Sequence, residues 1–412
     1  MQKTLYKAGT AIATAALLLG SISPFALAGV DVEISGNGAS SNNDANVSVS
    51  NSTGVVQSNT ADIQNNVSVM ANSGGNDANY NTGGDVSVTT GNASSDITVN
   101  NTANSNAASV NGCCPGSVEV KVSGNGYDSD NTANVGVVTS ATVVQRNSAN
   151  VENDVHSFLN TGWNDANWNT GGNVEIGTGN AKGDVDLSTK VNKNVAEISG
   201  NGSGALEVLI SGNGAKTDND AKVTVTSASQ IEQTNFADIL NDVLMFANSG
   251  KNDANWNTGG NVEIGTGNAE ADVDVENLAN FNAAEIDDCG CIVSGSVKVK
   301  DNGYDSDNTA NVVLASLNWA IQKNNLDCGD GMDACASVFV KSDTGKNDAN
   351  YNTEGGEPEV STGSAGGDVE INNTANQNVV GDVDLGDIVI PPFDFDGGSL
   401  SGLLVLLFGL FS

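Results

Sequence analysis

Residues 250–269 read GKNDANWNTGGNVEIGTGNA, and residues 162–181 repeat this stretch with one difference, Trp163 in place of Lys251. Gly, Asn, Asp and Thr dominate the stretch, and this composition alone is typical of a surface loop. A loop has no reason to recur almost letter for letter 88 residues along the chain. The stretch therefore marks an internal repeat, which is the strongest single indicator of fold.

The repeat extends through most of the chain. Related stretches occupy residues 74–93 and 345–365, and a second landmark, SGNG or its variant KDNG, precedes each copy at intervals of 88, 88 and 89 residues. These landmarks define a repeat domain of residues 29–384. Its four tandem modules cover about residues 30–117, 118–205, 206–294 and 295–384.

Each module carries the signals of short β-strands. Runs such as NVSVS, DVSVT and SVEVKV alternate apolar and polar residues, and Asn-x-Ala elements recur at Asn43, Asn59 and Asn76. We therefore expect an all-β, parallel β-solenoid, with rungs of roughly 15–22 residues, Asn and Gly at the corners, and stacked Asn side chains forming amide ladders. Such rungs would stack into a rod on the order of 80–110 Å long. A two-layered open β array and a disordered chain are the alternatives.

The two ends of the chain differ from the repeats. Residues 1–28 combine Lys3 and Lys7, an apolar run and an Ala-x-Ala site ending at Ala28, which predicts a secretory signal peptide. Residues 385–412 form a linker and an apolar tail that is shorter than the roughly 20 residues of a membrane span. The tail is either a sorting signal or membrane attachment, or a cap on the fold. We expect a secreted protein displayed on a bacterial cell surface.

Charge excludes one class of partner. The chain has 15 Lys and Arg against 50 Asp and Glu, for a net charge of −35. Binding to a nucleic-acid backbone needs clustered cations, so no nucleic-acid partner is expected. Divalent cations, glycans and other proteins remain, including further copies of this chain. The single histidine, His156, has no catalytic partner implied by its position, so we do not expect an enzyme.

A further pattern resembles a known family. The stretches VVQSNTADIQNNV (55–67), VVQRNSANVENDV (143–155) and IEQTNFADILNDV (231–243) share Gln, then Asn-x-Ala, then Asn. This spacing is similar to the curlin-type repeats of bacterial amyloid fibres, although those repeats have a Gly after the first Gln and end with a second Gln. The resemblance implies stacked rungs, amide ladders and self-association. More broadly, the chain resembles the Asn/Gly-rich repeat proteins that bacteria export to their surfaces.

The six cysteines form three local pairs: Cys113 with Cys114, Cys289 with Cys291, and Cys328 with Cys335. Disulfides are the default in an exported protein, and Cys328–Cys335, which closes the insertion CGDGMDAC, is the expected bridge. The other two pairs bridge locally or between molecules. Short rungs would separate the first two pairs by roughly 35–50 Å, too far for a bridge between them.

Two sets of residues are candidate binding sites. One aromatic residue per module follows the NDAN element, and these are Tyr80, Trp168, Trp256 and Tyr351. Exposed rings at these corners would bind glycans, whereas rings folded over the neighbouring Gly-Gly turn would be structural. Three Asp-x-Asp pairs either bind Ca²⁺ or are solvated turn residues: Asp128 with Asp130, Asp218 with Asp220, and Asp305 with Asp307.

These observations predict an exported structural or adhesive protein that forms an acidic β-solenoid rod and self-associates. The first alternative is a multivalent glycan-binding module that uses the aromatic corners. The second is a polysaccharide-active β-helix enzyme that uses paired carboxylates. No cofactor is expected other than Ca²⁺, and membrane contact would come through the C-terminal tail.

Overall fold

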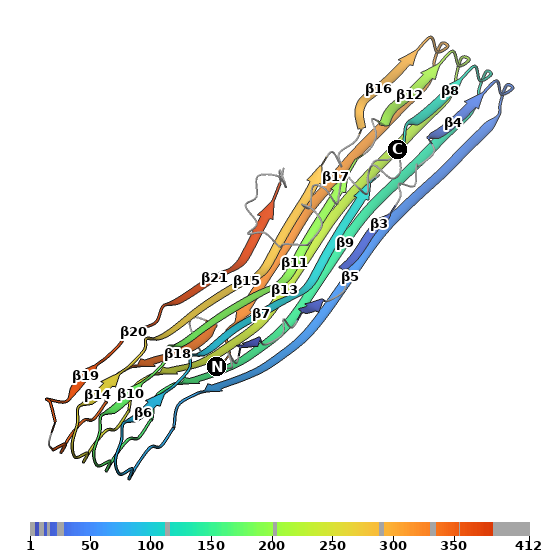
Figure 1. Cartoon of the computed structure of the whole chain (residues 1–412). Coiled ribbons are helices and arrows are strands. Elements are labelled where there is room, and N and C mark those ends of the chain that lie inside the picture. Colours follow the sequence, from blue (N-terminus) through green and yellow to red (C-terminus); the bar gives the residue numbers. More distant parts are fainter. Residues whose placement is uncertain are drawn as a thin grey trace.

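The computed structural model is a long, flat stack of four coils (Figure 1). It describes residues 29–111, 116–200, 204–287, 292–329, 335–353 and 355–381, together with the backbone of three short stretches, 5–7, 12–14 and 17–22. Every regular element in these residues is a strand. The predicted cleavage site at Ala28 and the C-terminal tail lie outside the described residues.

Each module forms one coil, with a short strand, a long strand, a turn and two returning strands. Coil 1 contains β4 (Val30–Ser35), β5 (Asn42–Asn72), β6 (Val86–Thr89) and β7 (Ala93–Asn111). Coil 2 contains β8 (Val118–Ser123), β9 (Asp130–Asn160), β10 (Val174–Gly177) and β11 (Ala181–Ser199). Coil 3 contains β12 (Gly204–Ser211), β13 (Asp218–Asn248), β14 (Val262–Gly265) and β15 (Ala269–Asp287). Coil 4 contains β16 (Ile292–Lys300), β17 (Asp307–Asp327), β18 (Ala336–Asp343), β19 (Glu359–Ser361), β20 (Ala365–Gly366) and β21 (Val369–Val380).

Equivalent strands of successive coils pair in parallel and in register. They form four sheets, ordered β4-β8-β12-β16, β5-β9-β13-β17, β6-β10-β14-β19 and β7-β11-β15-β20, with β18 on β13 and β21 on β15. Val86, Val174 and Val262 illustrate the register, since each pairs with the residue 88 positions away. The predicted parallel β-solenoid of four tandem modules is therefore confirmed.

Three short strands of the first 28 residues continue one of these sheets. They are β1 (Leu5–Lys7), β2 (Ile12–Thr14) and β3 (Leu17–Ile22). All three pair in parallel with β7, and Ile12 lies opposite Asn100, again 88 residues away. These three strands thus lie along the outer edge of coil 1, where a preceding coil would lie.

The size of the rung differs from the prediction. The rung is the whole module rather than 15–22 residues, because β5, β9 and β13 are each 31 residues long. Such a strand spans roughly 100 Å, whereas four coils stack to only about 15 Å between the first and the last backbone. The long axis of the molecule therefore runs along the strands, and the stacking axis is the short one (Figure 1).

The strands are long because buried asparagines do not interrupt them. Asn147 and Asn153 are at most 4% exposed, lie within β9, and bond amides of neighbouring coils. Buried amides are tolerated only when they are hydrogen-bonded, and a stack of identical coils supplies a partner on each side. The Asn-x-Ala elements, which are 16 and 17 residues apart, therefore lie one after another along a single coil and do not belong to successive rungs.

The interior alternates apolar clusters with amide layers. The sheet containing β5 forms one layer, and the sheets containing β4 and β7 form the facing layer. Four apolar clusters lie along this interface, such as Val55 with Val110 and Ile63 with Ala103. A fifth lies at the tip, where the sheet containing β6 packs with Ala166 and Ala254. Between the clusters of Val55 and Ile63, the column Asn59, Asn147, Asn235 and Asn324 faces the column Asn106, Asn194, Asn282 and Asn378. The amide ladders implied by the curlin resemblance are confirmed, but many lie inside strands rather than at corners.

One predicted disulfide is present. Cys328 and Cys335 are bonded, with their Cα atoms 4.2 Å apart, and close the insertion between β17 and β18. The other four cysteines lie outside the described residues. The distance argument against a bridge between Cys113-Cys114 and Cys289-Cys291 was wrong, because Asn111 and Asp287 pair with the same residue, Ser199. The strands next to these two pairs are therefore two spacings, or about 10 Å, apart.

Candidate functional site

The four aromatic corners form a single exposed column at one tip of the molecule. Their ring centroids are separated by 6.3, 5.0 and 4.1 Å from coil 1 to coil 4, and successive planes are within 9° of parallel. All four residues have positive φ between 57° and 63°, a strained conformation for aromatic residues that the shared stack sustains. They are Tyr80, Trp168, Trp256 and Tyr351, with exposed fractions of 74%, 47%, 45% and 68%.

Mutual stacking limits what the column can bind. Trp168 and Trp256 each have ring neighbours on both faces, so only the outer faces of Tyr80 and Tyr351 are open to a ligand. The Gly-Gly turn beside the rings is fixed by close backbone contact, since a Cβ on Gly172 would lie 2.1 Å from the Gly84 carbonyl oxygen. Glycan binding by the corners remains a prediction, with the two ends of the column as its geometrical candidates.

The register divides the candidate calcium pairs into different columns. Asp130, Asp218 and Asp307 lie in one column, in line with Asn42 of coil 1. Lys216 occupies the corner of coil 3 that Asp128 and Asp305 occupy in coils 2 and 4. Asp220 falls in a third column, between Thr132 and Thr309.

Among the described residues, no group of three His, Cys, Asp or Glu side chains is arranged to hold a metal ion. Calcium binding stays a prediction.

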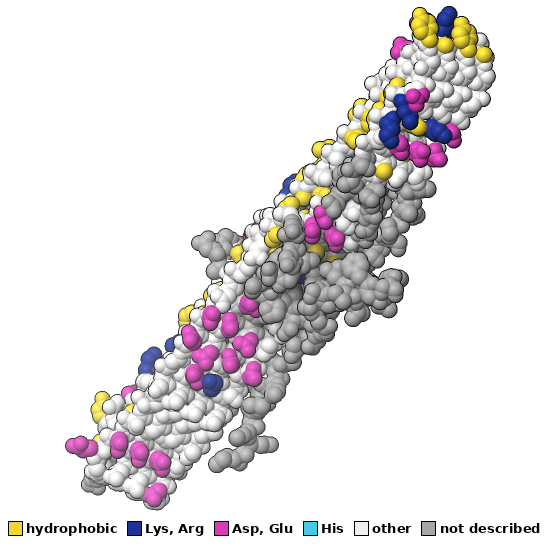
Figure 2. All heavy atoms as spheres, turned by 90° about the horizontal axis from the view of Figure 1, so that it is seen from above, with side chains coloured by type: hydrophobic (Ala, Val, Ile, Leu, Met, Phe, Trp, Pro, Cys, Tyr) yellow, Lys and Arg dark blue, Asp and Glu magenta, His cyan; other side chains and the backbone are white. Residues whose placement is uncertain are grey.

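Acidic side chains nevertheless gather in rows that cross the stack (Figure 2). The aspartates of the NDAN element form one such column through paired backbones: Asp77, Asp165, Asp253 and Asp348. Burial, followed by the charge of the stacked neighbours, raises the pKa values of Asp165 and Asp253. The pKa of Asp218 is raised by burial, then by the charge of Asp220 on the same strand, and then by Asp130 and Asp307 in its own column. Stacking like charges at one strand spacing therefore carries an electrostatic cost.

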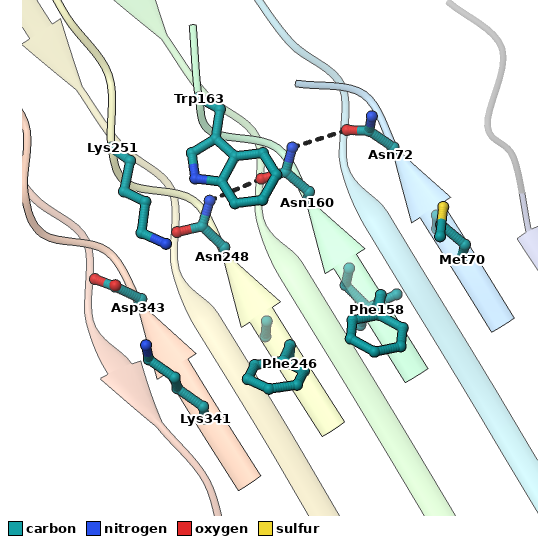
Figure 3. Close-up of a pocket in the computed structure, with 13 residues that line it drawn as sticks. Met70, Asn72, Phe158, Asn160, Trp163, Phe246, Asn248, Lys251, Lys341 and Asp343 are labelled. Carbon is teal, nitrogen blue, oxygen red and sulfur yellow. Dashed lines mark hydrogen bonds between the residues drawn. The ribbon is translucent and has the colours of Figure 1, made fainter. Parts of the chain in front are cut away.

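The sequence did not indicate a groove near the same tip (Figure 3). It has a volume of about 370 Å³ and is formed where β5, β9, β13 and β18 end. Its apolar side chains include Met70, Phe158, Phe246 and Trp163, and the rings of Phe158 and Phe246 stack at 5.2 Å. Its polar side chains are Asn72, Asn160, Asn248, Lys251, Lys341 and Asp343.

A short amide ladder forms one wall of this groove. Asn160 Nδ2 donates to Asn72 Oδ1 at 2.8 Å, and Asn248 Nδ2 donates to Asn160 Oδ1 at 2.7 Å (Figure 3). The ladder ends at Asn248, whose buried Oδ1 has no partner, because coil 4 carries Asp343 instead of a fourth amide. The groove therefore contains several polar groups beside an aromatic surface.

The two outer edges of the stack are a further exposed feature. The outer edge of coil 1 includes the 31-residue strand β5, and that of coil 4 includes β17 and β18. Among the described residues, this surface is paired only where β1, β2 and β3 lie on β7. Unpaired strand edges are templates for further strands.

Several internal ladders end at these edges with unpaired atoms. In one ladder, Asn104, Asn192, Asn280 and Asn376 are linked by amide bonds of 3.0, 2.9 and 3.0 Å. At the coil 1 end, the Oδ1 atom of Asn104 is buried and has no partner among the residues that the structure describes. At the coil 4 end, Asn376 Nδ2 has no partner in the described part of the chain. A second ladder consists of Gln57, Gln145, Gln233 and Gln322. It ends on coil 4 at the buried Gln322 Oε1, which has no partner in the described ranges.

The single histidine lies beside a carboxylate and an aromatic ring. His156 Nε2 lies 3.1 Å from Asp154 Oδ1 on the same strand, and its ring packs edge-on against Phe158. Within the described ranges, no helix is long and apolar enough to cross a bilayer. Comparison with protein-family models, curated proteins and solved structures finds no match to this chain. Any functional conclusion therefore comes from the geometry alone.

Proposed function

We propose that this protein is an exported structural protein that builds fibres by stacking coil 4 of one copy on coil 1 of the next. The observation that carries the proposal is the pair of open ladder ends at Asn104 and Asn376. An interface that joins the two different ends of a molecule by translation does not close on itself and generates an open filament.

The polarity of the ladders supports head-to-tail stacking. In the Asn104 ladder each Nδ2 donates toward coil 4, so one end is an acceptor and the other a donor. Placing Asn376 Nδ2 of one copy against Asn104 Oδ1 of the next would extend the ladder with the same geometry that it has inside the molecule. A buried acceptor left unpaired costs about 1–3 kcal/mol, and stacking would remove that cost.

The N-terminal strands provide a second line of support. They pair with β7 in parallel at the 88-residue register, so this edge of coil 1 accepts a strand in the way an inner coil does. β2 ends opposite Thr102 and β3 begins opposite Ser105, which leaves Asn104 between them. If the signal peptide is removed as predicted, this edge becomes available to β20 and β21 of another copy.

Charge opposes this assembly and makes it dependent on conditions. A junction would continue the acidic column that runs from Asp77 to Asp348, in a chain with a net charge of −35. Salt screens such repulsion and divalent cations bind carboxylates, so either should favour fibre growth. Attachment to the cell surface through the C-terminal tail belongs to the same proposal.

Electron microscopy of purified residues 29–412, with and without Ca²⁺, tests the proposal. We expect ribbons roughly 100 Å wide, with strands across the ribbon and a spacing of about 4.8 Å along its axis. The substitution Asn376→Asp keeps the acceptor used by Asn280 but removes the donor, and should reduce fibre yield several-fold. Asn311→Asp adds the same charge on the outer face of β17 and should leave the yield unchanged. Isolated rods under all conditions, or equal yields from both variants, would contradict the proposal.

A further inference from the structure

The two outer edges of the stack carry opposite charges at one tip of the molecule. There β4 and β16 are the outermost strands of their sheet, and in the described part of the chain each pairs on one side only (Figure 1). β4 of coil 1 exposes Asp31 and Glu33, whereas β16 of coil 4 exposes Lys298 and Lys300. Figure 2 shows basic and acidic side chains gathered together near this tip. The two edges are therefore complementary here, although the whole chain has a net charge of −35.

An ion pair inside the molecule shows how such charges meet when coils stack. Lys121 of β8 lies directly opposite Glu33 of β4 in the register of the two strands. Its Nζ atom donates to Glu33 Oε1 at 2.7 Å, and both side chains remain partly exposed. A lysine and a glutamate in the same column of adjacent coils therefore reach each other across one strand spacing.

The column that begins with Glu33 ends with a second lysine. Glu33, Lys121, Leu209 and Lys298 occupy equivalent positions in coils 1 to 4. When coil 4 of one copy stacks on coil 1 of the next in this register, Lys298 lies beside Glu33 of the neighbouring copy, as Lys121 does within one copy. Lys298 Nζ donates to Glu207 Oε1 at 3.2 Å, and more than half of the lysine side chain is exposed. Because an ammonium group has three donors, it can bind a second carboxylate.

The other charged columns do not supply such a pair. Three further lysines of coil 4 would face uncharged residues of the next copy: Lys300 with Ser35, Lys323 with Ser58, and Lys341 with Met70. Two columns would bring carboxylates together: Asp327 with Asp62, and Asp348 with Asp77. Asp62 lies roughly 60 Å along β5 from the β4 tip, and Asp77 lies at the opposite tip. Both distances are far greater than the Debye length of about 8 Å at physiological ionic strength, so the attraction at the β4 tip is independent of this repulsion.

We propose that Lys298 of one copy and Glu33 of the next form an ion pair that orients the copies and fixes their register. This inference rests on the stacking proposed above and names the residues that direct it. A slip of one residue would bring Lys298 opposite Val32 or Ile34, which face inward, so the pair forms only in the correct register. An exposed ion pair adds little affinity, but complementary charges steer the encounter and select the orientation.

Mixing two charge-reversed variants of residues 29–412 tests this pair. The measurement is the concentration of soluble protein that remains after fibres are sedimented at the end of assembly. Lys298→Glu alone places two carboxylates at every junction, and Glu33→Lys alone places two ammonium groups there. Each should raise the remaining soluble concentration at least about threefold. An equal mixture of the two variants should return to the value of the parent protein, because alternating copies place opposite charges at every junction.

The matched control is Lys300→Glu, which makes the same change of charge on the same strand but faces Ser35. Its effect should be less than half that of Lys298→Glu. Glu33→Gln removes the charge without placing a cation beside Lys121, and should change assembly in the same direction as Glu33→Lys.

Two outcomes would overturn the ion pair and leave the stacking intact. In the first, the parent forms fibres and Lys298→Glu and Glu33→Gln assemble as the parent does. In the second, the mixture assembles no better than either variant alone, while circular dichroism shows the parent fold for both. A parent protein that forms no fibres under any condition would instead contradict the stacking itself, and the ion pair with it.

Discussion

At the scale of single residues, the molecule depends on amides that bond in two directions. Asn194 is fully buried and its side chain takes part in four amide contacts, with Asn106, Asn147, Asn235 and Asn282, at 2.8–3.0 Å. Two of these contacts run along the stack and two cross to the facing layer. The same amide therefore fixes the register between coils and the packing between layers.

The substitution Asn194→Ala should destabilise the protein substantially. It leaves buried amide groups on the neighbouring columns without partners, which we expect to cost about 3 kcal/mol. The matched control is Asn134→Ala, which removes one amide contact with Asn46 on the outer surface and should change the free energy of unfolding by less than about 0.5 kcal/mol. Urea unfolding followed by circular dichroism measures both. Equal effects of the two substitutions would show that the buried ladders do not hold the coils together.

The stacked aspartates predict how stability depends on pH. The pKa values of Asp165 and Asp253 are raised in the folded chain, so the folded state binds protons more readily than the unfolded state. The free energy of unfolding should therefore rise as the pH falls from about 7 toward the ordinary pKa of Asp near 4. Glu33 has a lowered pKa beside Lys121, but this ion pair is at the surface and weak.

Thermal unfolding at a series of pH values checks the sign. The double substitution Asp165→Asn and Asp253→Asn should raise the melting temperature near neutral pH and flatten its pH dependence. If the melting temperature of the parent protein decreases as the pH is lowered from about 7 to about 5, the charges of these carboxyl groups do not destabilise the folded state.

The residue scale also shows what the sequence could reveal about the binding surfaces. Fixed offsets between modules identified the aromatic corners and the Asn columns, because a repeated residue stands out in a repeated fold. Trp163 is the single letter that distinguishes residues 162–181 from 250–269. Its contact with the Lys251 ammonium of the next coil, 5.1 Å from the centre of the ring, is visible only in the stacked structure.

At the scale of strands, the sequence showed the alternation of apolar and polar residues but did not show how long the strands are. The inward and outward positions of β9 alternate over 31 residues, as the apolar-polar pattern predicted for shorter runs. The sequence pattern predicts Asn at the corners, because an unpaired Asn favours turns, yet Asn147 and Asn153 lie within β9. In a stack, each is paired by the coils beside it, so the strand continues. Placing these asparagines at corners is what made one 88-residue coil look like several short rungs.

The N-terminal strands lead to a prediction at the same scale. They pair with β7 and occupy part of the coil 1 edge that the proposed fibre uses. The full chain of 412 residues should therefore form fibres more slowly than residues 29–412 at equal concentration. Sedimentation of assembled protein over time compares the two. Equal rates would mean that these strands do not protect the edge, or that stacking does not involve β7.

At the scale of the whole molecule, the repeat determines the thickness rather than the length. Each module adds one strand to every sheet, so the number of modules sets how many coils are stacked. The length of roughly 100 Å comes instead from the number of residues within one coil. In the proposed fibre, the long strands would set the width, and copies added at the two outer edges would set the length.

Deletion of residues 118–205, which removes coil 2 as a unit, tests this account most directly. The cut joins β7 of coil 1 to β12 of coil 3, in the way that β7 and β8 are joined in the parent. Small-angle X-ray scattering under conditions that prevent assembly should show an unchanged length of roughly 100 Å and a thickness reduced by about 4.8 Å. A particle whose long dimension falls by about a quarter would contradict the account, since the modules would then follow one another along the molecule.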